Sequence, residues 1–228
     1  MSAFLSDGDI ALRAIERTDL EQLRTWRNDP ELRSRTREWK ALNLQNQEGW
    51  FGRISDPQRT DHMFILEHDA QAIGVIGLCG WSQHDRHAEI SFYIGDTEQR
   101  GKGYMKRALS LLIGWGFQQG LHRIWAEVYD FNMASMKLLQ KLGFIFEGRQ
   151  RQHAFRDGRF VDSVMMGLLS IDTSKPLGDG HRDVLAEWLQ AQNFDTERHA
   201  SRKAKTLARV RRFRARKRQQ RLAMKETP

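Results

Sequence analysis

Hydrophobic and polar positions alternate in several short runs along the first half of the chain, a pattern typical of β-strands. The runs cover residues 10–15, 63–67, 73–81 and 88–94. Helical features lie between the first two runs: one helix is expected to start at Thr18 and a second to cover residues 45–54. The first half therefore predicts strands interrupted by helices.

The second half begins with apolar residues at helical spacing from Met105 to Phe117. A strand pattern follows at residues 124–129, then a short helix from Ser135, then two closing strands joined by a turn at residues 156–162. This order of elements predicts an α+β fold with one core, which the length of 228 residues allows.

The excess of basic over acidic residues lies entirely in the last part of the chain. The protein has a net charge of +8, and residues 181–228 alone hold 14 Lys/Arg against 5 Asp/Glu. A breaker cluster at residues 174–180 precedes this part. We therefore expect an N-terminal segment at 1–9, a folded domain at 10–170, a linker at 171–180 and a basic, helical C-terminal extension at 181–228.

Nucleic acid is one partner that such an extension would suit, since clustered Lys/Arg side chains bind phosphates. Helices are expected at residues 183–191 and from residue 196 onward, the second of them polar nearly all round and so expected to order on binding. A solvated end or a nonspecific polyanion binder explains the same composition. The candidate nucleic-acid-binding residues are Arg209, Arg211, Arg212, Arg214, Arg216, Lys217 and Arg218.

Composition also bounds the cellular setting. No run of residues approaches the ~20 apolar residues of a membrane span, and residues 1–9 are too polar for a secretory signal. The single cysteine, Cys79, lies in an apolar run, which favours an inert buried thiol over a nucleophile. The eight histidines lack metal-ligand spacing. We expect a cytoplasmic protein without a metal.

A glycine turn, Gln99–Met105, joins the strand at 88–94 to the helix that follows. Its sequence is Gln-Arg-Gly-Lys-Gly-Tyr-Met, and unpaired N–H groups at a helix N-terminus form an anion site. A Walker A loop is excluded because Tyr104 follows Gly103, and a dinucleotide fingerprint is excluded because Lys106 stands where a third glycine belongs. A phosphate site and an ordinary strand–helix turn both remain open.

Four motifs in order resemble the GNAT superfamily of acetyl-CoA-dependent N-acetyltransferases over about residues 8–170. They are Ala88-Glu89-Ile90-Ser91-Phe92, Gln99-Arg100-Gly101-Lys102-Gly103, Asn132-x-x-Ser135, and Leu142-Gly143-Phe144 followed by Glu147-Gly148. The segments at 26–30 and 156–162 are similar to the branch that holds ribosomal-protein N-terminal acetyltransferases and amino-sugar nucleotide acetyltransferases. Residues 26–30 also suit a helix stopped by proline, with Trp26 in the core.

The resemblance implies a mixed, mostly antiparallel central sheet flanked by helices, and acetyl-CoA as the acetyl donor. It places the pyrophosphate on the glycine turn and the pantetheine arm beside the end of the preceding strand. Asn132 also suits a plain helix N-cap. The implied cofactor-binding residues are Ile94, Arg100, Gly101, Lys102, Gly103, Tyr104, Met105, Asn132 and Ser135.

Catalytic residues are implied less directly. Glu89 matches a strand glutamate that serves some members as the base, although pairing with Arg86 or another strand charge is an equally simple explanation. Leu139 stands where many relatives have a tyrosine that protonates the departing thiolate, so Ser135 is the candidate acid. Met105 departs from the Gly or Ala common at the end of the turn.

Three functions remain open from the sequence. The first is acetylation of a primary amine on a macromolecule, either a protein N-terminus or a modified nucleobase, with the basic tail binding nucleic acid or a ribonucleoprotein. The second is acetylation of an amino-sugar nucleotide, and the third is a non-catalytic nucleic-acid-binding module on the same fold. Oligomeric state stays open.

Overall fold

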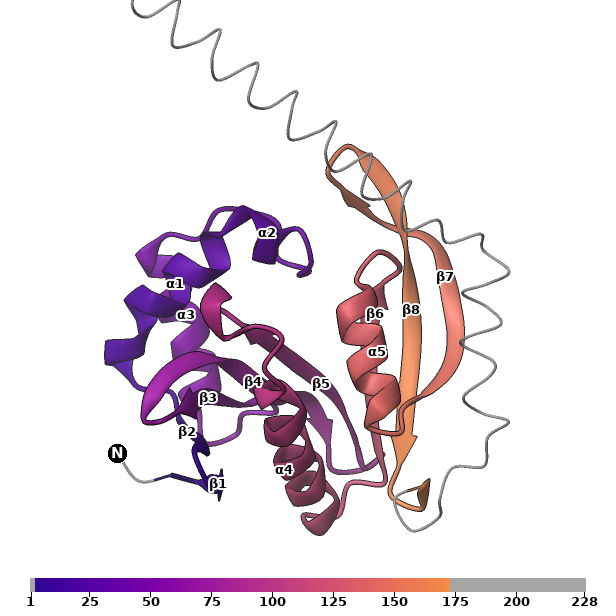
Figure 1. Ribbon diagram of the computed structural model, residues 1–228, viewed down its shortest axis with the longest axis horizontal. Helices are drawn as coiled ribbons and strands as arrows, with labels where there is room; N and C mark the ends of the chain where they lie inside the picture. The colour runs from indigo at the N-terminus through magenta and orange to yellow at the C-terminus, as the bar shows by residue number, and fades with distance from the viewer. Residues whose placement is uncertain (1–2, 173–228) are drawn as a thin grey trace, which may run out of the picture. The chain divides into compact units, whose positions relative to one another are not determined.

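An eight-stranded sheet forms the centre of the computed structural model, which describes residues 3–172 (Figure 1). Its order is β1-β2-β3-β4-β5-β6-β8-β7, and every described pair is antiparallel except β5 with β6. The strands are β1 (Leu5–Asp7), β2 (Ile10–Ala14), β3 (His62–His68), β4 (Gln71–Ser82), β5 (His87–Ile94), β6 (Arg123–Tyr129), β7 (Ile145–Arg156) and β8 (Arg159–Leu169). The expected mixed, mostly antiparallel sheet is confirmed.

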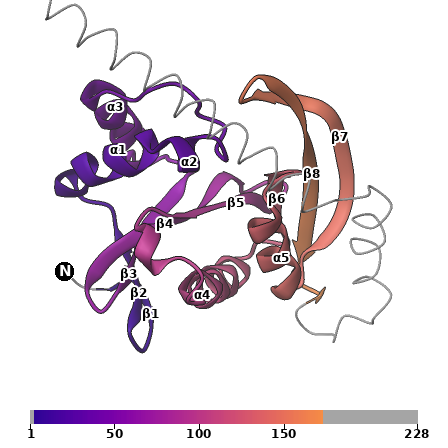
Figure 2. The same cartoon turned by 45° about the horizontal axis from the view of Figure 1, so that its top comes forward.

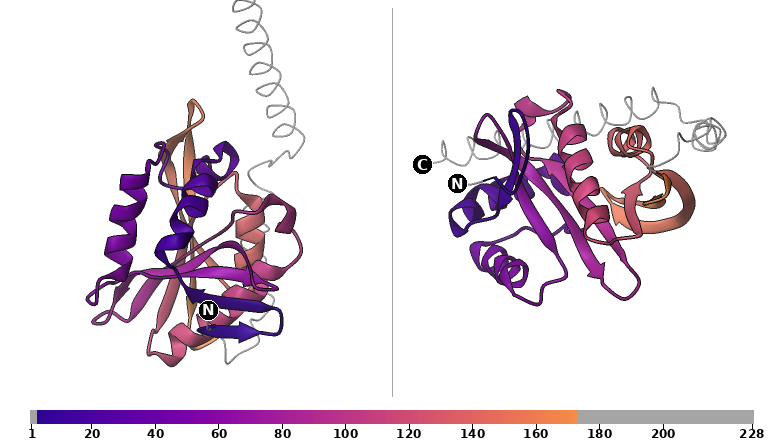
Figure 3. Two further views of the ribbon diagram at one scale, coloured as in Figure 1. Left: turned by 90° about the vertical axis from the view of Figure 1, so that its left-hand side faces the viewer. Right: turned by 90° about the horizontal axis from the view of Figure 1, so that it is seen from below.

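Helices cover both faces of this sheet (Figure 2). On one face lie α1 (Leu20–Asn28), α2 (Pro30–Arg33) and α3 (Leu44–Ser55). On the other lie α4 (Tyr104–Gln118) and α5 (Met133–Lys141), and Figure 3 shows α4 along the sheet opposite α1 and α3. Leu109 and Leu112 of α4 are fully buried, as the helical spacing predicts.

The parallel strands β5 and β6 pair over only three positions. His87, Ala88 and Glu89 face residues 123–125, and Glu89 opposite Trp125 is the last pair. Beyond it the strands diverge (Figure 1). Among the described strands, none pairs with the backbone of β5 on that side beyond Glu89, which is where a ligand can pair as an extra strand.

Some boundaries differ from those predicted. The sheet begins at Leu5, inside the expected N-terminal segment, because a glycine with φ 61° at Gly8 turns β1 back onto β2. The helix expected from Thr18 begins at Leu20, after a 3-10 turn at Arg17–Asp19. The two helices and the seven basic residues predicted in the tail lie outside the described residues. Among the described helices, none is long and apolar enough to span a bilayer.

Candidate active site

The glycine turn between β5 and α4 has the conformation of an anion-binding loop. Gly101 and Gly103 have φ of 81° and 87°, a region that favours glycine, and α4 starts directly after Gly103. The first amides to bond back to Gly103 O are those of Lys106 and Arg107, at 3.0 and 3.4 Å. The amides ahead of Lys106 have no carbonyl within the helix to reach, so they can bind an anion.

The side chains around the turn divide into two groups. Lys102 is exposed, and its Nζ donates to Gln99 Oε1 at 3.1 Å. Arg100 turns away from the loop: its Nε donates to Ile94 O at 3.2 Å and its Nη1 lies 3.4 Å from Glu31 Oε2. Of these two predicted basic residues, Lys102 therefore stays exposed at the turn, whereas Arg100 is hydrogen-bonded to the end of β5.

Tyr104 and Met105, the last two residues predicted on the turn, pack onto the protein. The Tyr104 ring stacks on His68, with centroids 4.0 Å apart, and Met105 is 6% exposed. Their backbone amides are the parts available to a ligand. Because the Met105 side chain is buried in the core, the turn accommodates methionine where Gly or Ala is common.

Glu89, the predicted base, sits where β5 and β6 part. Both of its carboxylate oxygens accept hydrogen bonds from Arg37, the one from Nη1 at 2.8 Å. Arg86, the partner that the sequence suggested, instead donates through Nε to Gly120 O at 2.7 Å. Glu89 is thus paired with a positive charge, one of the alternatives left open by the sequence, but the partner is Arg37 and not Arg86, because Arg86 precedes β5 in a positive-φ turn and faces the end of α4.

A second carboxylate, Glu127 of β6, shares the same guanidinium. Arg37 Nη2 donates to Glu127 Oε2 at 3.0 Å, and Ser163 Oγ donates to Glu127 Oε1 at 2.5 Å. His153 Nε2 lies 3.6 Å from Glu127 Oε1. Hydrogen bonding to Glu89, followed by the charge of both carboxylates, raises the pKa of Arg37 above its ordinary value, so Arg37 stays charged.

Sequence reasoning missed Arg37 and Glu127. Glu127 could have been identified from strand pairing. β5 and β6 are parallel neighbours, and position 127 lies two residues beyond the partner of Glu89, on the same face of the sheet. Arg37 belongs to an irregular segment between α2 and α3, 52 residues from Glu89, and no spacing rule connects them.

The segment that carries Arg37 is tied down at two places. Asn28 exchanges hydrogen bonds with the backbone of Leu42, each at 2.8 Å. Arg156 Nη2 donates to Thr36 O at 3.3 Å and to Arg37 O at 3.1 Å, and also to the Tyr129 hydroxyl at 2.5 Å. The backbone at Arg37 is thus bound to the β7–β8 hairpin.

The motif at residues 26–30 helps to build this region, and its Arg27 lines the cavity that contains Glu89. Trp26 is 8% exposed and its ring lies edge-on to Tyr93, 6.5 Å between centroids. Asp29 Oδ1 accepts from the backbone amides of Glu31 and Leu32 at 3.0 and 2.9 Å, which caps α2. The interpretation of Trp26 as a core residue at a helix end is confirmed.

Asn132 and Ser135 stand at the start of α5. Asn132 Oδ1 accepts from Ser135 N at 3.5 Å, so Asn132 is the helix N-cap. Ser135 is half-buried, and its hydroxyl is not needed for the cap. Leu139 is fully buried, which explains an apolar residue at the position where many relatives have a tyrosine.

A cavity of about 1180 Å³ brings several predicted residues together. Its lining includes Glu89, Asn132 and Ser135, along with Glu127 and Arg37. The turn residues 100–105 and Ile94 are not in this lining, among the described residues, and lie further along the split between the strands. Candidate base and candidate acid therefore share one cavity, and the anion loop is next to it in sequence and fold.

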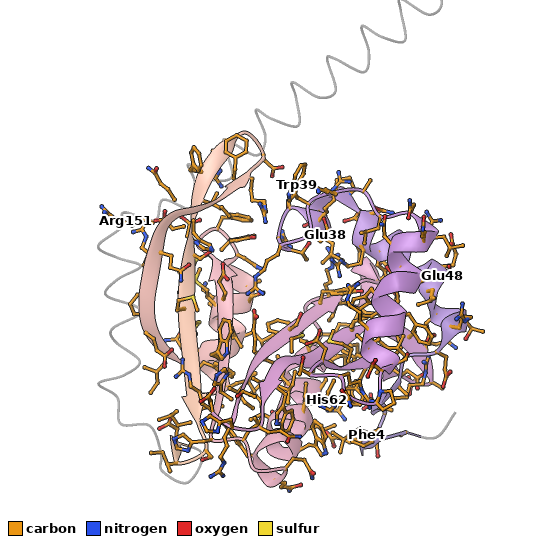
Figure 4. The ribbon with its side chains drawn as sticks, turned by 180° about the vertical axis from the view of Figure 1, so that it is seen from behind. Phe4, Glu38, Trp39, Glu48, His62 and Arg151 are labelled. Carbon is orange, nitrogen blue, oxygen red and sulfur yellow. The ribbon has the colours of Figure 1, made fainter. Side chains whose placement is uncertain are left out.

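A second hollow, of about 740 Å³, adjoins this cavity through shared lining residues. It lies between the segment after α2 and the β7–β8 hairpin, and it also contains Arg37 and Glu127. Figure 4 shows Glu38 and Trp39 on this segment, facing the hairpin. The exposed aromatic side chains that line this hollow are Trp39 (62%) and Phe155 (57%), and Phe160 lies edge-on to Phe155 with 5.2 Å between centroids.

Away from the cleft, Asp9, His68 and Asp69 bring metal-ligand atoms within 4.8 Å of one another. Asp9 is already paired with Arg107 at 2.6 Å, which lowers the pKa of Asp9 through the hydrogen bond. We assign no metal to this group, and the absence of a metal stays a prediction.

Comparisons with known proteins agree on one family. A protein-family model described as an acetyltransferase (GNAT) domain matches residues 9–145 of this chain. The uncharacterized N-acetyltransferase p20 of Bacillus licheniformis is 30% identical over 70% of this chain and 92% of its own length. The spermidine N(1)-acetyltransferase of Vibrio cholerae is 28% identical over 72% of this chain and 94% of its own length.

Two solved structures share the fold. The spermidine N-acetyltransferase from Vibrio cholerae, in complex with CoA and spermine, has a TM-score of 0.68 at 22% identity and covers 74% of this chain and 100% of its own. The ribosomal L7/L12 alpha-N-protein acetyltransferase RimL, in complex with coenzyme A, has a TM-score of 0.67 at 19% identity, with coverage of 74% and 98%.

Proposed function

The chain belongs to the GNAT family and is an acetyl-CoA-dependent N-acetyltransferase, and we propose that its acceptor is a primary amine of a macromolecule, foremost the α-amine of a protein N-terminus. The observation that carries the proposal is the route from the surface to the carboxylates. This route is lined by exposed Trp39 on one side and exposed Phe155 on the other, and it reaches Glu127, with Glu89 in the adjoining cavity. Solvent-exposed aromatic rings at an opening favour a chain that extends beyond the reacting amine.

Acetyl-CoA supplies a thioester whose acetyl group passes to the amine. The amides of Gly101–Met105 would hold the pyrophosphate, with Lys102 adding positive charge. The unpaired side of β5 near Ile94 would bind the pantetheine arm, with Asn132 and Ser135 on the opposite side. These donors fit the group because positive-φ glycines present amides rather than side chains to it.

Deprotonating an α-amine at neutral pH requires a weaker base than deprotonating a lysine side chain. At pH 7, deprotonating an amine of pKa ~7.8 costs about 1 kcal/mol, against about 4–5 kcal/mol for one of pKa ~10.4. Glu89 shares its oxygens with Arg37, so it suits the easier deprotonation. We assign Glu89 as the base and Ser135 as the acid that protonates the leaving thiolate.

Binding of nucleic acid by the basic tail is the second part of the proposal, and it would bring the enzyme to a ribonucleoprotein. Replacing Arg211, Arg212, Arg214 and Arg216 by Gln in the full chain tests it. Affinity for an RNA oligonucleotide should fall, and the slope of log K against log salt should flatten by ~0.7–0.9 for each phosphate that the tail no longer neutralises. Unchanged affinity would exclude this role.

Small amines are the competing acceptors. Relatives include spermidine N(1)-acetyltransferases, and two carboxylates in one cavity would attract a polyamine as well. The sequence also left amino-sugar nucleotides open. We propose a panel of spermidine, an amino-sugar nucleotide and peptides with free or blocked N-termini, assayed by thiol release and mass spectrometry. The highest kcat/KM is expected for free-N-terminus peptides, and a preference for spermidine or the sugar nucleotide would overturn the proposal.

A further inference from the structure

Two carboxylates and one guanidinium meet at the inner end of the acceptor route. Glu89 and Glu127 project from adjacent parallel strands on the same face, and Arg37 donates hydrogen bonds to both. The side chains of the two glutamates are 15% and 12% exposed, whereas that of Arg37 is 55% exposed. The two carboxylates are therefore mostly buried on the sheet, whereas the Arg37 side chain lies on their solvent-exposed side.

The two glutamates are fixed far more firmly than Arg37. β6 pairs with β8 along its whole length, and Ser163 of β8 donates to Glu127. The Arg37 side chain comes from the irregular segment between α2 and α3 and reaches the carboxylates from outside. Because Arg156 anchors the backbone at Thr36 and Arg37, the Arg37 side chain can swing out without unfolding the segment.

We propose that Arg37 occupies the place of the acceptor's ammonium group and that a cationic amine must displace it from Glu89 to react. Arg37 thereby selects acceptors that arrive protonated, because only a cation replaces the positive charge that Glu89 loses when Arg37 moves away from it. The inference rests on the proposed function in one respect, the assignment of Glu89 as base.

The exchange also sets the order of the proton step. While Arg37 is in place, both Glu89 oxygens accept hydrogen bonds from it, so an ammonium group cannot make the same pair of contacts. After the exchange, an N–H bond of the ammonium breaks, an O–H bond forms on Glu89, and the nitrogen lone pair is freed for attack. Arg37 stays hydrogen-bonded to Glu127.

A neutral amine gains nothing from this arrangement. It would leave Glu89 without the positive charge that Arg37 supplied, and a partly buried carboxylate is destabilised when the cation beside it is removed. Amines of low basicity are therefore expected to be poor acceptors even when they are good nucleophiles.

Arg37→Ala and Arg37→Lys, in the full chain, test the exchange through the split between KM and kcat. Removing an internal competitor should lower the KM of Arg37→Ala for the acceptor roughly two- to fivefold, the size expected when a half-exposed ion pair no longer has to be broken. Arg37→Lys keeps a cation and should stay near the wild-type KM. Arg24→Ala, which loses an arginine paired with Glu21 on α1 outside the cleft, is the matched control.

Guanidinium chloride at a non-denaturing concentration adds a readout that a purely structural role would not move. It should inhibit Arg37→Ala competitively against the acceptor, because it refills the emptied place, and should inhibit the wild type much less. A higher acceptor KM in Arg37→Ala, or guanidinium that restores kcat instead of competing, would overturn the inference.

The acceptor used is whichever amine of the panel is acetylated, so failure of the N-terminal proposal and failure of the Arg37 exchange are separate results. A preference for spermidine refutes the first and leaves this test intact. Thermal melting of each variant confirms that folded proteins are compared.

Discussion

Asn28 and Leu42 are joined by two hydrogen bonds although 14 residues separate them. The Asn28 amide donates to Leu42 O and accepts from Leu42 N, each at 2.8 Å. This pair closes the segment that carries Arg37 at its base, as a strand pair would. The side chain at the end of α1 therefore shapes the acceptor route from outside it.

Asn28→Ala should weaken acceptor binding and spare donor binding. Losing the side chain leaves the N–H and C=O groups of Leu42, a half-buried residue, without these partners, at a cost of about 1–3 kcal/mol in unfolding free energy. The acceptor KM should rise while the acetyl-CoA KM stays unchanged. Steady-state kinetics and urea unfolding measure both, and equal change in the two KM values would contradict this assignment.

Gly95→Ala should destabilise the protein through Trp26. A Cβ at position 95 would overlap the Trp26 indole, and the cost of such overpacking is about 1–3 kcal/mol. Gly52→Ala is the control, because a Cβ there meets nothing within 4 Å and alanine favours the helix by up to ~1 kcal/mol. Shifts of opposite sign in the denaturant midpoint are expected, and a neutral Gly95→Ala would show that Trp26 can move aside.

Gly103→Ala should raise the KM for acetyl-CoA. The positive φ of 87° strains alanine by about 1–3 kcal/mol, and relief of that strain would turn the amides of the turn away from the pyrophosphate. Gly120→Ala has the same kind of strain, at φ 94°, at the other end of α4. Both variants should lose stability, but only Gly103→Ala should lose donor affinity in isothermal titration with CoA.

Cys79 should make stability fall at alkaline pH. Burial raises the pKa of its thiol from 9.0 to about 12, so the folded state keeps a proton that the unfolded state loses. The contribution is fully present below about pH 9 and is lost as the pH rises toward 12, by up to ~1.4 kcal/mol per pH unit. Urea unfolding of wild type and Cys79→Ala between about pH 9 and pH 11 should show a steeper decline for the wild type. Parallel curves would contradict the burial argument.

The elements could be predicted largely from periodicity, because most strands and helices here have one buried face. The strand pattern at 10–15 and the helical spacing from Met105 matched β2 and α4 closely. β1 was missed because its three residues are too short to show a period and two of them are exposed. α2 was missed because a four-residue helix has little periodicity to show, although Asp29 and Pro30 are helix-start residues.

The two ends of the candidate site also differ in how far the sequence predicts them. The donor turn could be found because φ-positive glycines and a helix start leave a local signature. At the acceptor end only Glu89 was named from the sequence, through its motif, and Arg37 could not be, since it lies on an irregular segment that only the tertiary fold brings to Glu89 and Glu127. Asn132 shows the converse: its local role as a helix N-cap was one of the two interpretations that the sequence offered, and the structure confirms it.

The proposed function depends above all on Glu89 lying at the end of a route for protein N-termini. The most direct measurement incubates wild type and Glu89→Gln with acetyl-CoA and a mixture of peptides bearing free α-amines, with lysine amines as internal competitors, and quantifies acetylated sites by mass spectrometry. We predict acetylation of α-amines over lysine amines by the wild type, and a kcat/KM lower by ~10²–10⁴-fold in Glu89→Gln. Lysine acetylation that equals or exceeds α-amine acetylation, or full activity of Glu89→Gln, would contradict this assignment.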